Sequence, residues 1–238
     1  NEQCPAGEDI AGYMYLAAQG KFEEAWRLIM KENPFPAVMG RVCYHSCESE
    51  CNRAEHDDPV SINRVERFIG DYALVHSIEI DFSRPEIDRS VAIVGAGPAG
   101  LTSAYHLRLM GYGVTVFDSS EHPGGLMRYG IPAYRLPKEI LDGEIDRLSN
   151  IGIDFRMGVK IGESIAWEKI SSEFDAVFVA IGAYQEADPG IKGMDKTGVV
   201  NALDFLKEVN CGKYPKMGKK VAVIGGGNSA IDCARVSL

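Results

Sequence analysis

A glycine-rich turn between an apolar strand and a helix is the feature that most constrains the fold of this chain. Val91–Gly100 reads Val-Ala-Ile-Val-Gly-Ala-Gly-Pro-Ala-Gly, a buried-strand pattern that runs into G-x-G-x-x-G. A helical pattern follows as far as Gly111, and a second strand pattern then ends in Asp118. In this strand–turn–helix–strand context the glycines permit a tight turn and a close pyrophosphate, and the helix N-terminus attracts its charge. The turn therefore predicts dinucleotide binding, with Asp118 as an acceptor for ribose hydroxyls.

A second copy of the pattern lies near the end of the chain. Lys219–Ala230 again reads as a strand, a glycine turn and a helix, with Ala230 in place of the third glycine. A sharp turn without a ligand is the alternative reading of this copy. Two fingerprints favour two dinucleotides, and a flavin paired with a nicotinamide is the combination we expect.

The segment between the fingerprints carries a long glycine-containing loop, Glu121–Pro137. An irregular surface loop is possible, but ligand-free loops of this length are uncommon. The pattern then predicts a helix over Glu139–Leu148, a short extended stretch containing Val159 and Ile161, and a buried parallel strand over Phe174–Ala183.

The first part of the chain is helical and holds most of the cysteines. Apolar residues at helical spacing predict two helices, Ile10–Ala17 and Phe22–Ile29, the second ended by Asn33-Pro34. A C-x3-C-x3-C run follows, formed by Cys43, Cys47 and Cys51, and Cys4 stands alone upstream. Four cysteines suffice for one iron–sulfur cluster, which we favour. Zinc with His45 and His56 as further ligands, and unligated thiols, are the alternatives.

A helix with an acidic residue inside its apolar face follows this run. Ser61 is the expected N-cap, and Glu66 lies on the stripe formed by Ile62, Val65, Ile69 and Ala73. A buried carboxylate needs a compensating partner. From the pattern alone an arginine, Arg41 or Arg64, is favoured over a metal.

Charge and hydropathy exclude several classes of function. The net charge of −9 gives no electrostatic support for nucleic-acid binding, and no apolar run approaches the ~20 residues that span a bilayer. We expect a cytoplasmic protein without a membrane span. Most of the negative charge lies before residue 90, where we favour a role in solubility over partner docking.

Taken together, these segments resemble the flavoprotein family that contains the small subunit of bacterial glutamate synthase. The N-terminal part of dihydropyrimidine dehydrogenase and the large subunit of NADH-dependent ferredoxin:NADP oxidoreductase are similar as well. The resemblance runs from Cys4-Pro5 to the end of the chain. Its most specific parts are Gly40–Cys51, Pro59–Glu66, Gly95–Gly100, Gly124–Pro132 and Gly225–Ala230.

The resemblance implies FAD at the first fingerprint, NADPH or NADH at the second, and 4Fe–4S clusters in the helical part. It implies that one cluster is held by Cys4, Cys43, Cys47 and Glu66, which reverses the preference for an arginine beside Glu66. Cys51 would ligate another cluster, with three cysteines expected before residue 1. The implied dinucleotide contacts are Val42, Gly95, Ala96, Gly97, Pro98, Ala99, Gly100, Asp118, Ser119, Gly124, Gly125, Leu126, Arg135 and Ile161 for FAD, and Gly225, Gly226, Gly227, Asn228 and Ser229 for the nicotinamide.

We therefore expect an α/β protein with a helical iron–sulfur domain over residues 1–85. An FAD-binding Rossmann-like domain over 86–190 and the start of a second, truncated one over 191–238 would follow it. The expected function is electron transfer between NAD(P)H, FAD and 4Fe–4S clusters, with an electron-accepting or electron-donating subunit as partner. Part of a ferredoxin:NADP oxidoreductase and a non-catalytic scaffold are the alternatives. A disulfide reductase is disfavoured because the chain has no C-x-x-C, and no side chain is nominated as a catalytic acid or base.

Overall fold

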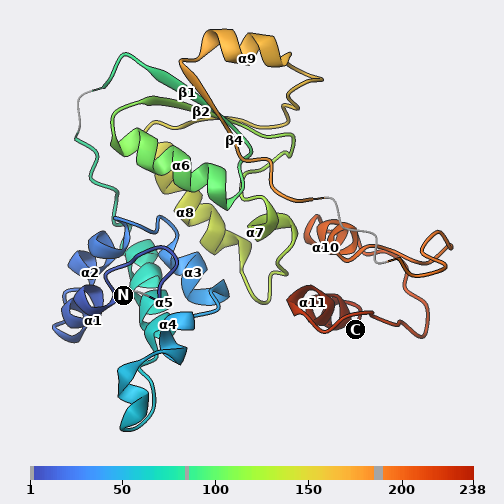
Figure 1. Ribbon diagram of the computed structural model, residues 1–238, viewed down its shortest axis with the longest axis horizontal. Coiled ribbons are helices and arrows are strands. Elements are labelled where there is room, and N and C mark those ends of the chain that lie inside the picture. The colour runs from blue at the N-terminus through green and yellow to red at the C-terminus, as the bar shows by residue number, and fades with distance from the viewer. Residues whose placement is uncertain (1–2, 84–85, 185–189) are drawn as a thin grey trace.

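The computed structural model describes residues 3–83, 86–184 and 190–238, and the predicted domain junction at Pro85 lies outside them. The N-terminal part is helical, as predicted, and Figure 1 shows its helices gathered beside the sheet. Its elements are α1 (Ile10–Ala18), α2 (Phe22–Ile29), α3 (Pro36–Val42), α4 (Ser46–Ser49), the 3-10 helix η1 (Asn52–Glu55) and α5 (Ile62–Val75). Ser61 occupies the N-cap position of α5, but its side chain makes no capping hydrogen bond.

Helices α3 and α5 pack with their backbones in direct contact, because each places a glycine at the crossing. A Cβ atom on Gly40 would meet the backbone of Arg67, and one on Gly70 would meet the backbone of Ala37. Cys43 directly follows α3 and Glu66 lies on α5. The close crossing therefore brings a thiol and a carboxylate from different helices to the same region.

A four-stranded parallel sheet follows, in the order β3-β2-β1-β4. Its strands are β1 (Ser90–Val94), β2 (Gly113–Phe117), β3 (Asp154–Arg156) and β4 (Ala176–Val179). Helices α6 (Pro98–Leu109), α7 (Leu126–Tyr129), α8 (Lys138–Asn150) and α9 (Trp167–Glu173) connect them. This is the predicted Rossmann-like arrangement, with Asp118 directly after β2.

Both faces of the sheet are covered near its centre. Ile93 of β1 packs into the core that α6 and α8 share with the N-terminal helices, while Ala92 packs against Ile170 of α9 on the opposite face. Figure 1 shows α6 and α8 between the sheet and the helical part, and α9 on the far side of the strands. Successive side chains of a strand point to opposite faces, so a parallel strand covered on both sides reads as a continuous apolar run.

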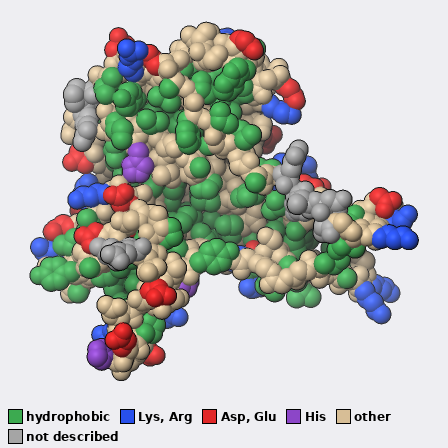
Figure 2. Space-filling model, in the orientation of Figure 1, with side chains coloured by type: hydrophobic (Ala, Val, Ile, Leu, Met, Phe, Trp, Pro, Cys, Tyr) green, Lys and Arg blue, Asp and Glu red, His purple; other side chains and the backbone are tan. Residues whose placement is uncertain are grey.

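The structure corrects the expected burial of the strand over Phe174–Ala183. It pairs in parallel with β1, as predicted, but Phe178, Val179 and Ile181 are 42%, 53% and 66% exposed. Figure 2 shows hydrophobic side chains gathered at the surface around this sheet. The sequence pattern identified an apolar strand correctly, but β4 lies at the edge of the sheet, and of its residues only Val177 packs against α9, beside Ile170.

The second fingerprint forms its helix but not its strand. Residues 219–224 form no regular element and pair with none of the described strands, and Ile224 is 76% exposed. A parallel strand needs a hydrogen-bonded neighbour, and none of the described strands lies beside this segment. Helices α10 (Ala202–Asn210) and α11 (Asn228–Val236) pack together and form the separate arm seen in Figure 1.

A buried carboxylate joins the sheet domain to the helical part. Glu144 of α8 is 1% exposed, and its two oxygens accept the N–H groups of Ala37 at 2.8 Å and Val38 at 3.1 Å. These N–H groups belong to the first turn of α3, which has no intrahelical partner for them. Glu144 therefore caps a helix that lies 106 residues away in the sequence.

Because of Glu144, we expect the stability of the chain to fall as the pH rises from about 5 to about 8. Burial raises the pKa of Glu144 from 4.5 to about 8, against the opposing effects of its two N–H donors and of Arg147 and Arg41. A raised folded-state pKa gives stability that is complete below the unfolded value and is lost as the pH approaches the folded value. Denaturant unfolding at several pH values measures the decline. Glu144→Gln should show a shallower decline, and an identical slope in both proteins would contradict the assignment.

Candidate cofactor sites

Three glycines of the first fingerprint have three different surroundings. Gly95 has a φ of +116°, and a Cβ atom there would meet the carbonyl oxygen of Ala180. A Cβ atom on Gly100 would meet the carbonyl oxygen of Gly95, so this glycine allows α6 to pack on the turn. Gly97 has only the Cα atom of Gly125 nearby, at 3.9 Å from such a Cβ. Gly97 therefore leaves open space in which a ligand can approach the backbone.

The glycine pair of the long loop lies directly against this turn. Gly124 donates its N–H to the carbonyl oxygen of Ala96 at 2.8 Å, and a Cβ atom on Gly125 would lie 2.6 Å from the Cα atom of Gly97. Leu126 begins α7 immediately afterwards. Two backbone segments without side chains thus meet beside the N-terminus of α6, where Pro98 and Ala99 are exposed. This cradle fits a dinucleotide pyrophosphate, because the first N–H groups of a helix have no intrahelical partner.

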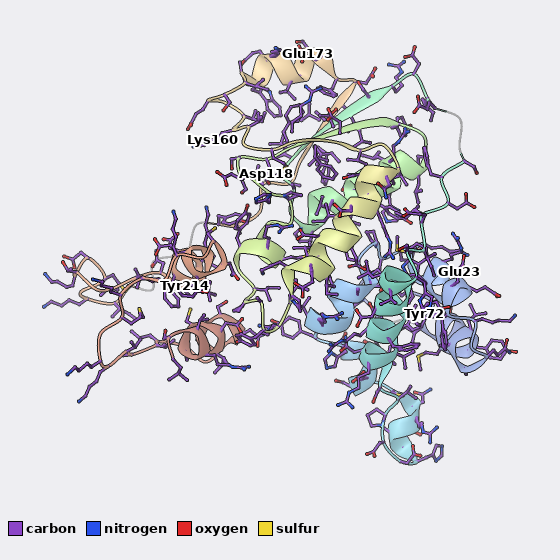
Figure 3. All side chains as sticks on the ribbon, turned by 180° about the vertical axis from the view of Figure 1, so that it is seen from behind. Glu23, Tyr72, Asp118, Lys160, Glu173 and Tyr214 are labelled. Atoms are coloured by element: carbon purple, nitrogen blue, oxygen red, sulfur yellow. The ribbon has the colours of Figure 1, made fainter. Side chains whose placement is uncertain are left out.

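Asp118 lies at the ends of the strands, next to the loop that carries α7 (Figure 3). Its carboxylate accepts the N–H of Ala96 at 2.7 Å and that of Ser120 at 2.8 Å. Asp118 thus orders the glycine turn, while a carboxylate keeps further lone pairs for a ribose hydroxyl. Exposed Ser119 lies beside it, and the extended stretch leading to Ile161 is joined to it by the Val159 N–H, which donates to the Asp118 carbonyl at 2.8 Å.

Two other predicted FAD contacts lie elsewhere. Val42 is the last residue of α3 and is half-buried against the core, next to Cys43. Arg135 donates to Asp232 of α11 at 2.7 Å, and Asp232 also accepts from the hydroxyl of Tyr134 at 2.5 Å. Arg135 therefore joins the loop to the helix of the second fingerprint in this structure.

The second fingerprint is open to solvent. Gly225–Ser229 are all exposed, and Gly225 has a φ of +122°, close to that of Gly95. Gly227 caps α11 with an extended backbone, as Gly97 caps α6. Added Cβ atoms on Gly226 and Gly227 would meet nothing within 4 Å. Both turns thus adopt one backbone form, although only the first is held by a sheet.

One cavity of about 560 Å³ joins the predicted cluster ligands to the first fingerprint. Its lining from the helical part includes Cys4, Cys43, Cys47 and Glu66. Its lining from α6 consists of Pro98, Ala99, Thr102 and Ser103. The volume lies within the range of ordinary ligand sites. The structure therefore brings four of the five predicted iron ligands to the wall of a space that also reaches the dinucleotide turn.

The lining of this cavity fits an iron–sulfur cluster better than a single zinc ion. The described residues contain no group of three or more His, Cys, Asp or Glu side chains that converge on one metal ion. Each iron of a four-iron cluster takes its own ligand, so the ligands of a cluster stand around a larger body. In addition, the buried hydroxyl of Tyr13, which lines the cavity, has no hydrogen-bond partner in the described part of the chain. A sulfur atom of a bound group would supply the missing acceptor.

Two of the cavity cysteines, Cys43 and Cys47, have thiols that burial disfavours in the ionised form. Burial is the main cause that raises the pKa values of Cys43 and Cys47 above 9.0. Metal binding reverses this, because a coordinating thiol gives up its proton. Cys51 differs: backbone N–H groups, chiefly that of Val60, lower the pKa of its thiol. Cys51 lines a second cavity of about 830 Å³, which Cys47 lines as well.

Glu66 is 6% exposed, and its partner is an amide instead of the arginine favoured by the pattern alone. Arg41 is engaged with Asp71 at 2.6 Å, and Arg64 is exposed. The side-chain N–H₂ of Asn33 donates to Glu66 at 3.0 Å. Burial, followed by the charges of Glu8 and Glu144, raises the pKa of Glu66 to about 9.

The sequence did not identify Asn33 and Glu8, the two cavity residues that form the hydrogen-bond network with Glu66. Asn33 reads in the sequence as a helix stop before Pro34, and Glu8 as one acid in a polar segment ahead of α1. Only their meeting in space, 25 residues apart along the chain, reveals a shared role.

No helix of the described chain has the length and apolar character needed to cross a bilayer.

Comparison with known proteins assigns families to both parts of the chain. Residues 1–78 match the family described as dihydropyrimidine dehydrogenase domain II, 4Fe-4S cluster. Residues 89–237 match the pyridine nucleotide-disulphide oxidoreductase family. The second match includes both glycine fingerprints.

Individual relatives cover the whole chain. The NADPH-Fe(3+) oxidoreductase subunit beta of Geobacter sulfurreducens is 42% identical over 100% of this chain and 36% of its own length. The glutamate synthase [NADPH] small chain of Escherichia coli is 35% identical over 99% of this chain and 53% of its own length. Among solved structures, 2-naphthoyl-CoA reductase with bound 2-naphthoyl-CoA has a TM-score of 0.52 at 26% identity, over 74% of this chain and 24% of that one. The chain thus spans about a third to a half of the length of these curated relatives.

Proposed function

Since this chain belongs to the pyridine nucleotide-disulphide oxidoreductase family, among the iron–sulfur flavoproteins that include the glutamate synthase small chain, we propose that it is an electron-transfer module. In this proposal electrons pass between a nicotinamide dinucleotide, FAD and a 4Fe–4S cluster, and from there to or from a partner subunit. We do not propose the disulphide chemistry in the family's description for this chain, because that chemistry uses a C-x-x-C pair and the sequence contains none.

The single observation that carries the proposal is the shared cavity. Thiols of Cys4, Cys43 and Cys47 line the same space as Pro98 and Ala99 of the first fingerprint. A structural metal site has no need to adjoin a dinucleotide turn, whereas an electron path requires the two groups to be close. When bound, FAD takes two electrons from a nicotinamide and releases them singly, and a 4Fe–4S cluster carries one at a time.

The residues of the chain supply binding and orientation. Gly97 and Gly125 leave room for a pyrophosphate, and the N-terminus of α6 offers N–H groups to it. Asp118 holds the turn in shape through the N–H of Ala96. The buried rings of Tyr13 and Phe35 help to wall the cavity. No proton transfer is assigned to a side chain in this proposal.

The partner is proposed from the names of the relatives. Both curated relatives are named as one chain of a larger assembly, a subunit beta and a small chain. We propose that this chain likewise passes electrons to or from a second subunit, and that the reaction there differs among relatives. The same proposal includes the dinucleotide contacts assigned at the two fingerprints, the three domain ranges and a cytoplasmic location.

Replacing single cysteines tests the proposal. In the protein purified without oxygen, we expect Cys43→Ser to lower the iron content by one cluster, about four atoms, while flavin is retained. Flavin should still bleach with NADPH or NADH, but electron delivery to a one-electron dye should fall at least about tenfold, because a side chain that binds the cluster directly is lost. Absorption spectra, iron analysis and stopped-flow reduction measure these quantities.

Two matched variants serve as controls. Cys211→Ser changes an exposed cysteine outside the cavity and should leave iron and flavin unchanged. Cys51→Ser should spare the cluster of this cavity, because Cys51 lines the other one. A folded wild-type protein that contains neither flavin nor iron would refute the proposal.

A further inference from the structure

A buried hydrogen-bond network lies behind the thiols of the shared cavity. The side-chain Nδ2 of Asn33 donates to Glu8 Oε1 at 2.9 Å and to Glu66 Oε1 at 3.0 Å. Asn33, Glu8 and Glu66 are each only 5–6% exposed. The three residues come from separate segments: Glu8 precedes α1, Asn33 follows α2, and Glu66 lies in the middle of α5.

The orientation of the Asn33 amide is fixed by the backbone. Its Oδ1 accepts the N–H of Phe35 at 2.9 Å, so the N–H₂ group must face the two acids. An N–H₂ group has two hydrogens, and each carboxylate here takes one of them. Both hydrogens and the oxygen of the Asn33 amide are thus engaged in hydrogen bonds. Rotating the amide by half a turn would place its oxygen against two acidic side chains.

The network leaves one oxygen of Glu66 available. Among residues 3–83, 86–184 and 190–238, no hydrogen bond involves Oε2 of Glu66. Glu66 lines the cavity together with Cys4, Cys43 and Cys47, so this oxygen belongs to a side chain that borders the space of the thiols. Glu66 is therefore held through one oxygen and can bind a ligand through the other.

We propose that Asn33 is the positioning residue for Glu66 as an iron ligand, and that Glu8 holds Asn33 from the opposite side. This inference rests on the proposed function, because it presumes a cluster in the cavity. Partners of metal ligands generally fix the orientation of those ligands, and their loss weakens metal binding about 10–100-fold. In this proposal Asn33, which follows α2, orients the carboxylate of Glu66 on α5.

The experiment replaces Asn33 by Asp, which keeps the size of the side chain and removes both donors. In the full protein purified without oxygen, we expect Asn33→Asp to release cluster iron to a chelator about 10–100-fold faster than wild type. We also expect altered g values in the EPR spectrum of the reduced cluster and a shifted midpoint potential. Glu66→Gln should alter the same EPR signal, because it replaces the ligand itself.

Controls separate positioning from general stability. Asn150→Asp makes the same chemical change at an exposed position outside the cavity and should leave all three readouts unchanged. Where Asn33→Asp fails to fold, Asn33→Ala removes both donors without adding a charge and takes its place. A lower melting temperature with wild-type g values, potential and iron release would overturn the inference. A wild-type protein without iron would overturn the proposed function and the inference together, whereas an iron-containing wild type with unaffected Asn33 variants overturns the inference alone.

Discussion

Gly97→Ala and Gly100→Ala are expected to give opposite results, although the two glycines lie three residues apart in one turn. Gly100→Ala should lower the free energy of unfolding by about 3 kcal/mol or more, because its Cβ atom would meet the carbonyl oxygen of Gly95, which is backbone and cannot rotate away. Natural proteins have only about 5–15 kcal/mol of stability, so a loss of this size is severe. Denaturant unfolding measures it.

Gly97→Ala should leave stability within about 1 kcal/mol of wild type and strongly weaken flavin binding. The backbone at Gly97 is extended, which alanine adopts freely, and the added Cβ atom has only one neighbour, at 3.9 Å. The same methyl group would occupy the space in which a pyrophosphate approaches the turn. We expect the Kd for flavin to rise at least about tenfold, which corresponds to about 1.4 kcal/mol or more of binding free energy. Absorbance of the purified variant should show a correspondingly lower flavin content.

The second fingerprint supplies the matched control. Gly227 caps α11 with nearly the same backbone angles that Gly97 has at α6. Gly227→Ala should keep flavin at the wild-type level while weakening binding of the nicotinamide dinucleotide. Equal flavin content in Gly97→Ala and Gly227→Ala would show that the first turn does not hold the flavin.

Local patterns predicted the elements of this fold well. Helical spacing located α1, α2, α5 and α8, and the strand–glycine–helix pattern located β1, α6 and β2. These features are set by short stretches of chain, which is why they can be read from the sequence. The cysteine spacing likewise predicted a shared site, and the structure places three of the four early cysteines around one cavity.

Features that depend on distant neighbours were missed. Residues 219–224 have the composition of a strand, yet a strand forms only where another strand pairs with it. The burial expected for Phe178 failed for the same reason, because covering an edge strand requires elements from elsewhere. The pattern alone favoured an arginine beside Glu66, since charge is the obvious compensation, and the family resemblance replaced it by a cluster iron. Neither indicated the neutral amide of Asn33, which the structure places against this carboxylate.

Glu144→Ala is expected to cost about 3 kcal/mol of stability and also to loosen the iron site. Without the carboxylate, the buried N–H groups of Ala37 and Val38 lose their acceptors at the start of α3. A buried donor left without a partner costs about 1–3 kcal/mol, in addition to the lost hydrogen bonds. Cys43 directly follows the last residue of α3, so a displaced α3 would also move this proposed cluster ligand.

Two variants on the same helix make the Glu144→Ala result decisive. Asp146→Ala changes an exposed acid of α8 and should alter the free energy of unfolding by less than about 0.5 kcal/mol. Glu144→Gln keeps one acceptor and should fall between Asp146→Ala and Glu144→Ala. Denaturant unfolding and iron release to a chelator should rank the three variants in the same order. If iron release stays at the wild-type rate while stability falls, Glu144 holds the two domains together without positioning Cys43.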